Sequence, residues 1–171
     1  MTRKTRAIGS ALIVGGIILC GAACAPTQAE DLLAFGSEPA TICVPVTSGA
    51  QIVVADQVRL LHSTTPVTLE SAHLVEGEGL EIADAFIVRN KDGMGVGTML
   101  LDAPDPLWAD RVPLEGATLT GNHVWSVALV LKREGSAAGQ ADAMSVTYRT
   151  QSGAELEAAG AMEIQLRERC G

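Results

Sequence analysis

Four cysteines and three histidines are the residues of this chain whose types could do chemistry. Cys20 and Cys24, with three residues between them, lie in the stretch IILCGAACAPTQ (17–28), where an apolar run becomes polar. A redox pair needs two intervening residues at the start of a folded helix, and a zinc site needs further ligands nearby. Because the nearest histidine is His62, the sequence predicts neither kind of site at these two cysteines.

The histidines His62, His73 and His123 are far apart, and none has the spacing of metal ligands. Copper is the one metal that stays open, because exported copper carriers combine His with Met. The methionines available for it are Met94, Met99, Met144 and Met162. The cluster of Cys, His and Met near the C-terminus of cupredoxins is missing, since no histidine follows Cys170. We therefore predict no metal ligand and no cofactor, with an extracytoplasmic copper-binding protein as the alternative function.

The sequence also lacks an arrangement of catalytic side chains. His62 and Ser63 are neighbours, and neighbours on a strand point to opposite faces. Glu76 and Glu78 lie in a Gly-rich turn, where both carboxylates are solvated. The stretch GMGVG (93–97) lacks the third glycine and the following helix of a nucleotide-binding loop. We predict that the protein is not an enzyme.

Composition and charge indicate one acidic domain. The chain has 171 residues, of which 47% are hydrophobic, and this length suits a single hydrophobic core. Its formal net charge is −8, and Arg3, Lys4 and Arg6 contribute +3, so the remainder has −11. A surface of this charge repels nucleic acid and anionic lipid headgroups. Nucleic acid is therefore excluded as a partner.

The N-terminus has the layout of an export signal. A basic start (MTRKTR) is followed by an apolar run from Ala7 to Leu19 and by the small residues CGAACA. Residues 1–23 are the predicted signal peptide. Two other outcomes stay open: residues 7–25 are just long enough to remain as an uncleaved anchor, and TQA before Glu30 fits an ordinary cleavage site.

The residues GAAC (21–24) resemble the bacterial lipoprotein box, in which two small residues precede the cysteine that becomes the lipidated N-terminus. The resemblance implies that Cys24 is lipidated. Cys20 fits less well, because the bulky Leu19 precedes it. The chain is also similar to the small exported lipoproteins of bacteria with GC-rich genomes. Both likenesses imply an extracytoplasmic domain anchored to the cell membrane.

Cys43 and Cys170 are the cysteines that remain after the signal region. Because disulfides persist outside the cytoplasm, we predict a bond between them. Such a bond closes a long loop, stabilises the fold by about 2–5 kcal/mol and holds the last strand beside the first. The alternative is two separate buried thiols.

Beyond the signal, periodicity predicts a tether and an all-β domain. Residues 24–40 read as the tether, docked through Leu32, Leu33 and Phe35, and residues 41–171 as the domain. Apolar residues alternate with period two in several segments that turn residues separate. The predicted strands are 41–46, 51–62, 67–75, 80–89, 123–133, 143–150 and 161–170.

The faces of these strands suggest which residues form the core. Trp125, Val127, Leu129 and Leu131 share one face, as do Met144, Val146 and Tyr148, and as do Met162, Ile164 and Leu166, with Cys170 in line. Turns are predicted at 76–79, 90–93, 134–139 and 151–153. In DPLWADRV (105–112), Asp105 can cap a short helical turn that starts at Pro106 and buries Trp108.

Seven or eight short strands, a buried Trp in a central strand and a terminal disulfide predict an immunoglobulin-like two-sheet sandwich. A lipocalin-like barrel is the alternative fold. With no catalytic or ligand-binding motif, we predict a membrane-tethered, non-catalytic binding or scaffolding module of the cell envelope. Its expected partners are the membrane, reached through the N-terminal lipid or anchor, and an envelope protein.

Overall fold

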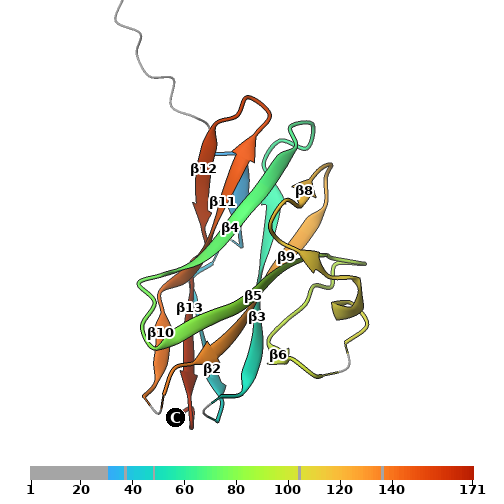
Figure 1. The fold of residues 1–171 in the computed structure, drawn as a ribbon. Coiled ribbons are helices and arrows are strands. Elements are labelled where there is room, and N and C mark those ends of the chain that lie inside the picture. Colours follow the sequence, from blue (N-terminus) through green and yellow to red (C-terminus); the bar gives the residue numbers. More distant parts are fainter. Residues whose placement is uncertain (1–30, 37, 48, 104, 136) are drawn as a thin grey trace, which may run out of the picture.

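The computed structural model describes residues 31–36, 38–47, 49–103, 105–135 and 137–171. These residues form β-strands and one 3₁₀ turn, so the predicted all-β fold is confirmed (Figure 1). The elements are β1 (Leu33–Phe35), β2 (Ala40–Pro45), β3 (Gln51–Leu60), β4 (Val67–Val75), β5 (Leu80–Arg89), β6 (Met99–Leu100), η1 (Trp108–Asp110), β7 (Val112–Pro113), β8 (Thr118–Leu119), β9 (Val124–Arg133), β10 (Gly139–Ala141), β11 (Ala143–Thr150), β12 (Glu155–Ala159) and β13 (Met162–Arg167).

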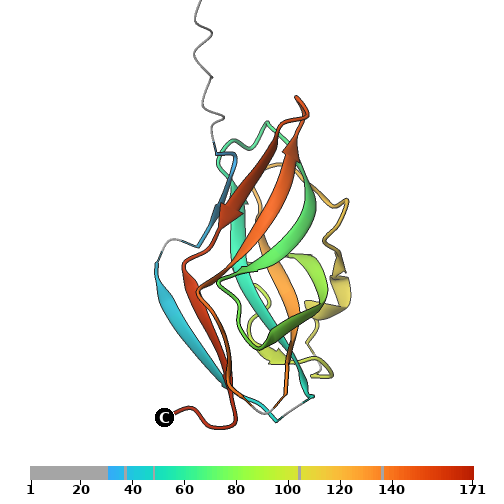
Figure 2. The same cartoon turned by 60° about the vertical axis from the view of Figure 1, so that its left-hand side comes forward.

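The strands form two layers. The first layer has the order β1-β3-β9-β5-β7, with β6 paired to β3. The second layer consists of two short sheets, β12-β11-β4-β8 and β10-β13-β2. They belong together, because β10 leads into β11 and β12 leads into β13. Figures 1 and 2 show that β10 with β11, and β12 with β13, run along the same side of the sandwich.

A change of register divides the second layer. The upper half, as drawn in Figure 1, holds the β11–β12 ladder, in which Ser145 pairs with Ala159. The lower half holds the β10–β13 ladder, in which Ala141 pairs with Ile164. Four residues on one strand therefore span the same distance as five on the other, which is the definition of a β-bulge. The extra residue falls next to Gly160, whose N–H donates to the carbonyl of Met144.

The topology is that of an immunoglobulin domain. The order β1-β3-β9-β5 matches the A-B-E-D sheet, and β4-β11-β12 matches the C-F-G sheet. Strand β2 leaves the first layer and pairs in parallel with β13. The immunoglobulin-like sandwich is therefore the fold of this chain, and the barrel alternative is wrong. The connection from β5 to β9 is unusually long, because it contains β6, η1, β7 and β8.

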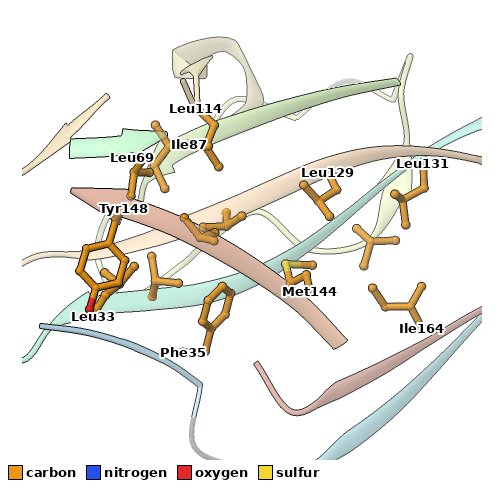
Figure 3. Packing of buried hydrophobic residues seen from close by; sticks show 14 of the residues in the cluster. Leu33, Phe35, Leu69, Ile87, Leu114, Leu129, Leu131, Met144, Tyr148 and Ile164 are labelled. Carbon is orange, nitrogen blue, oxygen red and sulfur yellow. The ribbon is translucent and has the colours of Figure 1, made fainter. Parts of the chain in front are cut away.

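The main core lies between the layers (Figure 3). The predicted inner faces of β9, β11 and β13 supply much of it. Val127, Leu129 and Leu131 of β9 are fully buried, as are Met144, Val146 and Tyr148 of β11 and Ile164 and Leu166 of β13. Strand β3, which pairs with β9, adds Ile52, Val54 and Val58. Alternation in the sequence thus predicted the core face of the long strands correctly.

A second, smaller core covers the outer face of the first layer. The connection from β5 to β9 packs Val96 and Trp108 onto Val53, Val88 and Val130. Strand β9 is therefore buried on both faces. The predicted burial of Trp108 is confirmed, whereas the prediction of a buried Trp in a central strand is corrected, because Trp125 of β9 is only partly buried.

The short helical turn forms as its residues predict. The Oδ1 atom of Asp105 accepts hydrogen bonds from the N–H groups of Leu107 at 2.7 Å and Trp108 at 3.2 Å. The 3₁₀ turn itself begins two residues after Pro106. The guanidinium of Arg111 lies 4.7 Å from the ring centroid of Trp108 and 5.4 Å from that of Phe86, which closes the small core from outside.

The predicted disulfide between Cys43 and Cys170 is present, with a Cα–Cα distance of 5.9 Å. Cys43 lies opposite Gln165 in the β2–β13 ladder. One detail of the prediction is wrong: β13 ends at Arg167, and Cys170 is exposed rather than in line with the core residues. The chain end turns back towards β2 (Figure 2) and reaches Cys43 from outside the ladder.

The folded domain begins inside the segment predicted as a tether. Leu33 and Phe35 are buried, and β1 pairs with β3 in the register Leu33 to Leu60. The Leu32 N–H donates to the hydroxyl of Tyr148 at 3.1 Å. The docking of this segment is confirmed, and it makes β1 an integral strand. The signal peptide, Cys20, Cys24 and the tether up to residue 30 lie outside the described residues.

Across the described ranges, we find no helix with the length and apolar composition that a membrane crossing requires.

Candidate binding groove

The predicted metal candidates lie on separate elements. His62 follows β3 and is exposed, and His73 of β4 lies 2.8 Å from the Ser71 hydroxyl. The Arg89 guanidinium is 2.9 Å from Nε2 of His123, just before β9. Of the methionines, Met144 is buried and Met94 is largely exposed. In the part of the chain that the structure describes, no three His, Cys, Asp or Glu residues come together in a way that could hold a metal ion.

A surface hollow of about 330 Å³ lies between the edges of the two layers. We call it the β1–β12 groove. Strand β1 and the residues next to it line one wall, and β12 with Ala161 after it lines the other. The lining residues are Asp31, Leu33, Ala34, Phe35, Gly36, Leu61, Glu157, Ala158, Ala159 and Ala161. Most of these side chains are small or apolar, so the groove can receive side chains from a partner.

The open edge of β12 borders this groove. β12 pairs with β11 and ends its sheet. In an antiparallel ladder, residues of the hydrogen-bonded pairs direct both main-chain groups to the neighbour, and the alternate residues direct them away. The Gly160 N–H donates to the Met144 carbonyl, and the Thr150 N–H donates to the Ala154 carbonyl. These two hydrogen bonds show which alternate residues of β12 face β11. Glu155, Glu157 and Ala159 therefore direct their N–H and C=O groups outward.

Strand β2 leaves this edge open. Its ladder with β13 starts where Ala40 pairs with Met162, and the Ala40 N–H donates to the carbonyl of Ala161 at 3.3 Å. Strand β1 runs past β12 but pairs with β3 instead. Among the described residues, no strand pairs with β12 on the side away from β11, although Figure 2 shows β1 running past it there. The described fold thus has a five-residue open edge next to an apolar groove.

The groove is acidic. Glu157 and Asp31 line it, and neither carboxylate has an ion-pair partner among the described residues. Glu155 lies on the same face of β12 as Glu157, and its Oε2 is 3.8 Å from a guanidinium nitrogen of Arg149. That guanidinium also contacts Glu70 at 2.9 Å. Negative charge next to open main-chain groups favours a cationic partner.

A carboxylate also points into the sandwich below the groove. Asp56 has the same parity on β3 as the core residues Val54 and Val58. A Cβ atom on Gly160 would lie 2.7 Å from its Oδ2 atom, so Gly160 is what makes room for it. Burial raises the pKa of Asp56 above its usual value, and a hydrogen bond from the Gln57 N–H offsets part of that rise.

Sequence reasoning missed this groove because it missed β12. The segment ELEAA (155–159) has two acids and two alanines, residues that are depleted in strands. The signal available was the alternation of Leu156 and Ala158 with the two glutamates. Those two apolar residues do pack against the main core.

No protein-family model and no curated protein matches the chain. Some solved structures have a similar fold. A PapD-like domain of human CEP192 is 9% identical over 95% of this chain and 99% of that one, with a TM-score of 0.41. The VesB protease of Vibrio cholerae is 12% identical over 80% of this chain, with a TM-score of 0.40. The chain spans 32% of the protease's length. These similarities say nothing about function.

Proposed function

We propose that this protein is an exported lipoprotein, tethered to the cell membrane through Cys24, that acts as a non-catalytic binding or scaffolding module of the cell envelope. The observation that supports a binding role most directly is the open edge of β12 beside the β1–β12 groove. Folded proteins usually cover or blunt an edge of this kind, so an open edge beside an apolar groove is typical of a binding surface.

Two further observations support export and tethering. The bond between Cys43 and Cys170 requires an oxidising compartment to persist. The segment from Cys24 to Asp31 spans seven residues, which reach at most about 25 Å when fully extended. A lipid on Cys24 would therefore hold the β1 end of the sandwich close to the membrane.

The lipid attachment is tested by metabolic labelling with a radioactive or clickable fatty acid. The wild-type chain should incorporate the label, Cys24→Ala should lose it, and Cys20→Ala should keep it. Cys20→Ala is the matched control, because it removes a cysteine from the same segment. Undiminished label on Cys24→Ala would show that Cys24 is not the lipidated residue.

The binding role is tested by photo-cross-linking in the native envelope. A photoreactive residue at Ala159, on the open edge, should capture a specific envelope protein. The same residue at Glu134, in the exposed turn after β9, should not. Equal capture from both positions, or none from Ala159, would contradict a binding surface at the β1–β12 groove.

A further inference from the structure

From the register of β12 and the charges around it, we infer that the β1–β12 groove binds an extended segment of a partner protein as an added β-strand, and that this segment alternates cationic and apolar residues. The inference deepens the proposed function and relies on it only for placing the partner in the envelope near the membrane.

The other edges are less suitable for strand addition. In the described residues, β1, β7 and β8 have only two or three residues each. Strand β2 ends at Pro45 and is joined at Cys43 to the returning chain end. The free part of β5 has a bulge between Ile82 and Asp84. Such features blunt an edge, whereas β12 has neither proline nor bulge over five residues, about 17 Å.

The alternation of the partner follows from the geometry of the ladder. When the added strand is antiparallel, partner residues hydrogen-bonded to Glu155 and Glu157 place their side chains on the same face as those carboxylates. Cationic side chains suit these positions. The residues between them point to the other face, towards the small and apolar groove lining. Leu61, which is 46% exposed at the end of the groove, is available to pack against them.

A second copy of the chain fits the same edge poorly. Antiparallel pairing of two β12 strands centred on Glu157 would place two glutamates directly opposite each other. Like charges in that position are destabilising. The acidic face of β12 therefore disfavours self-association at this edge and leaves it open to a cationic strand.

The test titrates the purified full-length protein, in detergent, with the peptide acetyl-Lys-Val-Lys-Val-Lys-amide and follows backbone amides by NMR. We expect saturable binding with a dissociation constant of about 1 mM or tighter. The amide protons of Glu155, Glu157 and Ala159 should become protected from exchange. The peptide acetyl-Glu-Val-Glu-Val-Glu-amide should not bind.

Two modified peptides separate strand addition from simple charge attraction. N-methylation of the central Lys removes an N–H that faces β12 and should abolish binding. N-methylation of either Val removes an N–H that faces solvent and should leave binding unchanged. Equal binding of all three peptides would overturn the inference, because attraction between charges alone needs no main-chain donor.

Variants of the protein locate the site. Glu157→Lys should weaken binding roughly tenfold, because it replaces attraction by repulsion. Glu157→Pro removes an outward N–H without removing a β11–β12 hydrogen bond, and it should also weaken binding. Glu134→Lys, which makes the same change of charge in the turn after β9, should have little effect. Unchanged thermal unfolding would show that each variant is folded.

No saturable binding up to about 5 mM peptide would overturn the inference, as would protection of amides away from β12. Concentration-dependent dimers cross-linked through β12 would show that a second copy is the occupant instead. All these readouts use purified protein, so they do not depend on lipid at Cys24. A failed labelling experiment would thus reject the tether, and a failed titration would reject strand addition.

Discussion

The upper and lower halves of the last β-hairpin differ in what lies beside them. In the lower half, β13 pairs on one side with β10 and on the other with β2, and the disulfide joins β2 to the chain end. In the upper half, β12 pairs with β11 alone. The same two strands thus form a closed, structural half and a half with an open edge.

The boundary between the halves is the bulge at Gly160. Only a residue without a side chain fits between Asp56 and Phe35 there. Because β2 joins the ladder just below this point, the open edge of β12 begins just above it. The difference shows what leaves this strand edge uncovered. The cause is the point at which the neighbouring strand changes layers, and not the composition of the edge itself.

The largest expected effect comes from removing the disulfide that holds the lower half together. The double variant Cys43→Ser/Cys170→Ser should lose about 2–5 kcal/mol of unfolding free energy, because the unfolded chain regains the entropy of a long loop. Denaturant unfolding measures the loss, with the reduced wild-type protein as control. Hydrogen exchange should accelerate in β2 and β13 more than in β11 and β12. Equal acceleration in both halves would contradict the distinction.

An ion pair near the end of the chain adds to the effect of this disulfide. The guanidinium of Arg133 is buried, and its nearest carboxylate is Glu168 at 3.4 Å. Its Nε atom has no hydrogen-bond partner among the described residues. Release of the chain end would leave this cation without its carboxylate, which adds to the expected loss.

A smaller effect should follow from filling the space at the boundary. In Gly160→Ala, the new Cβ atom would lie 2.7 Å from Oδ2 of Asp56 and 3.3 Å from the Phe35 ring. We expect a loss of about 1–3 kcal/mol, since overpacking forces neighbours out of place. Gly97→Ala is the control, because nothing lies within 4 Å of its added Cβ. A similar loss in both variants would show that Gly160 is not under special constraint.

The next effect concerns the pH dependence of stability. Burial raises the folded-state pKa of Asp56 above its ordinary value of 3.8, so the folded protein binds a proton more readily than the unfolded chain does. The contribution of Asp56 to stability therefore falls as pH rises from 3.8 through the raised pKa. Asp56→Asn should stabilise the protein at neutral pH by less than Gly160→Ala destabilises it. This advantage should shrink as the pH is lowered through that window.

Thermal unfolding of wild type and Asp56→Asn at several pH values measures this difference. Asp84→Asn, which changes an exposed carboxylate on β5, is the matched control and should change stability little at any pH. A difference between wild type and Asp56→Asn that does not vary with pH would contradict the role assigned to burial.

The smallest expected effect involves no mutation. In the unliganded protein, amides of Glu155, Glu157 and Ala159 should exchange with solvent roughly tenfold faster, or more, than those of Leu156 and Ala158, because only the latter donate to β11. Strand β13, which pairs with β10 on one side and β2 on the other, should not show this alternation. Hydrogen exchange followed by NMR measures both patterns. Uniform protection along β12 would mean that its edge is covered.

Much of the fold was predictable because most strands bury one face. The predicted strands 67–75, 80–89 and 143–150 coincide with β4, β5 and β11, since alternating apolar residues and turn residues mark both their faces and their ends. The disulfide was predictable from export and from the even number of remaining cysteines. The groove was not, because one of its walls is the poorly strand-like segment 155–159 and the other was taken for part of a tether.

The sequence by itself determined the class of fold, the inner faces of its long strands and the partners of its disulfide. These depend on side-chain periodicity and residue type, which are local properties. Only the tertiary structure decided that Trp125 is no more than partly buried and that β9 is covered on both faces. It also decided that β2 leaves the edge of β12 uncovered. Such features depend on where the chain crosses between layers, which results from packing among residues distant in sequence.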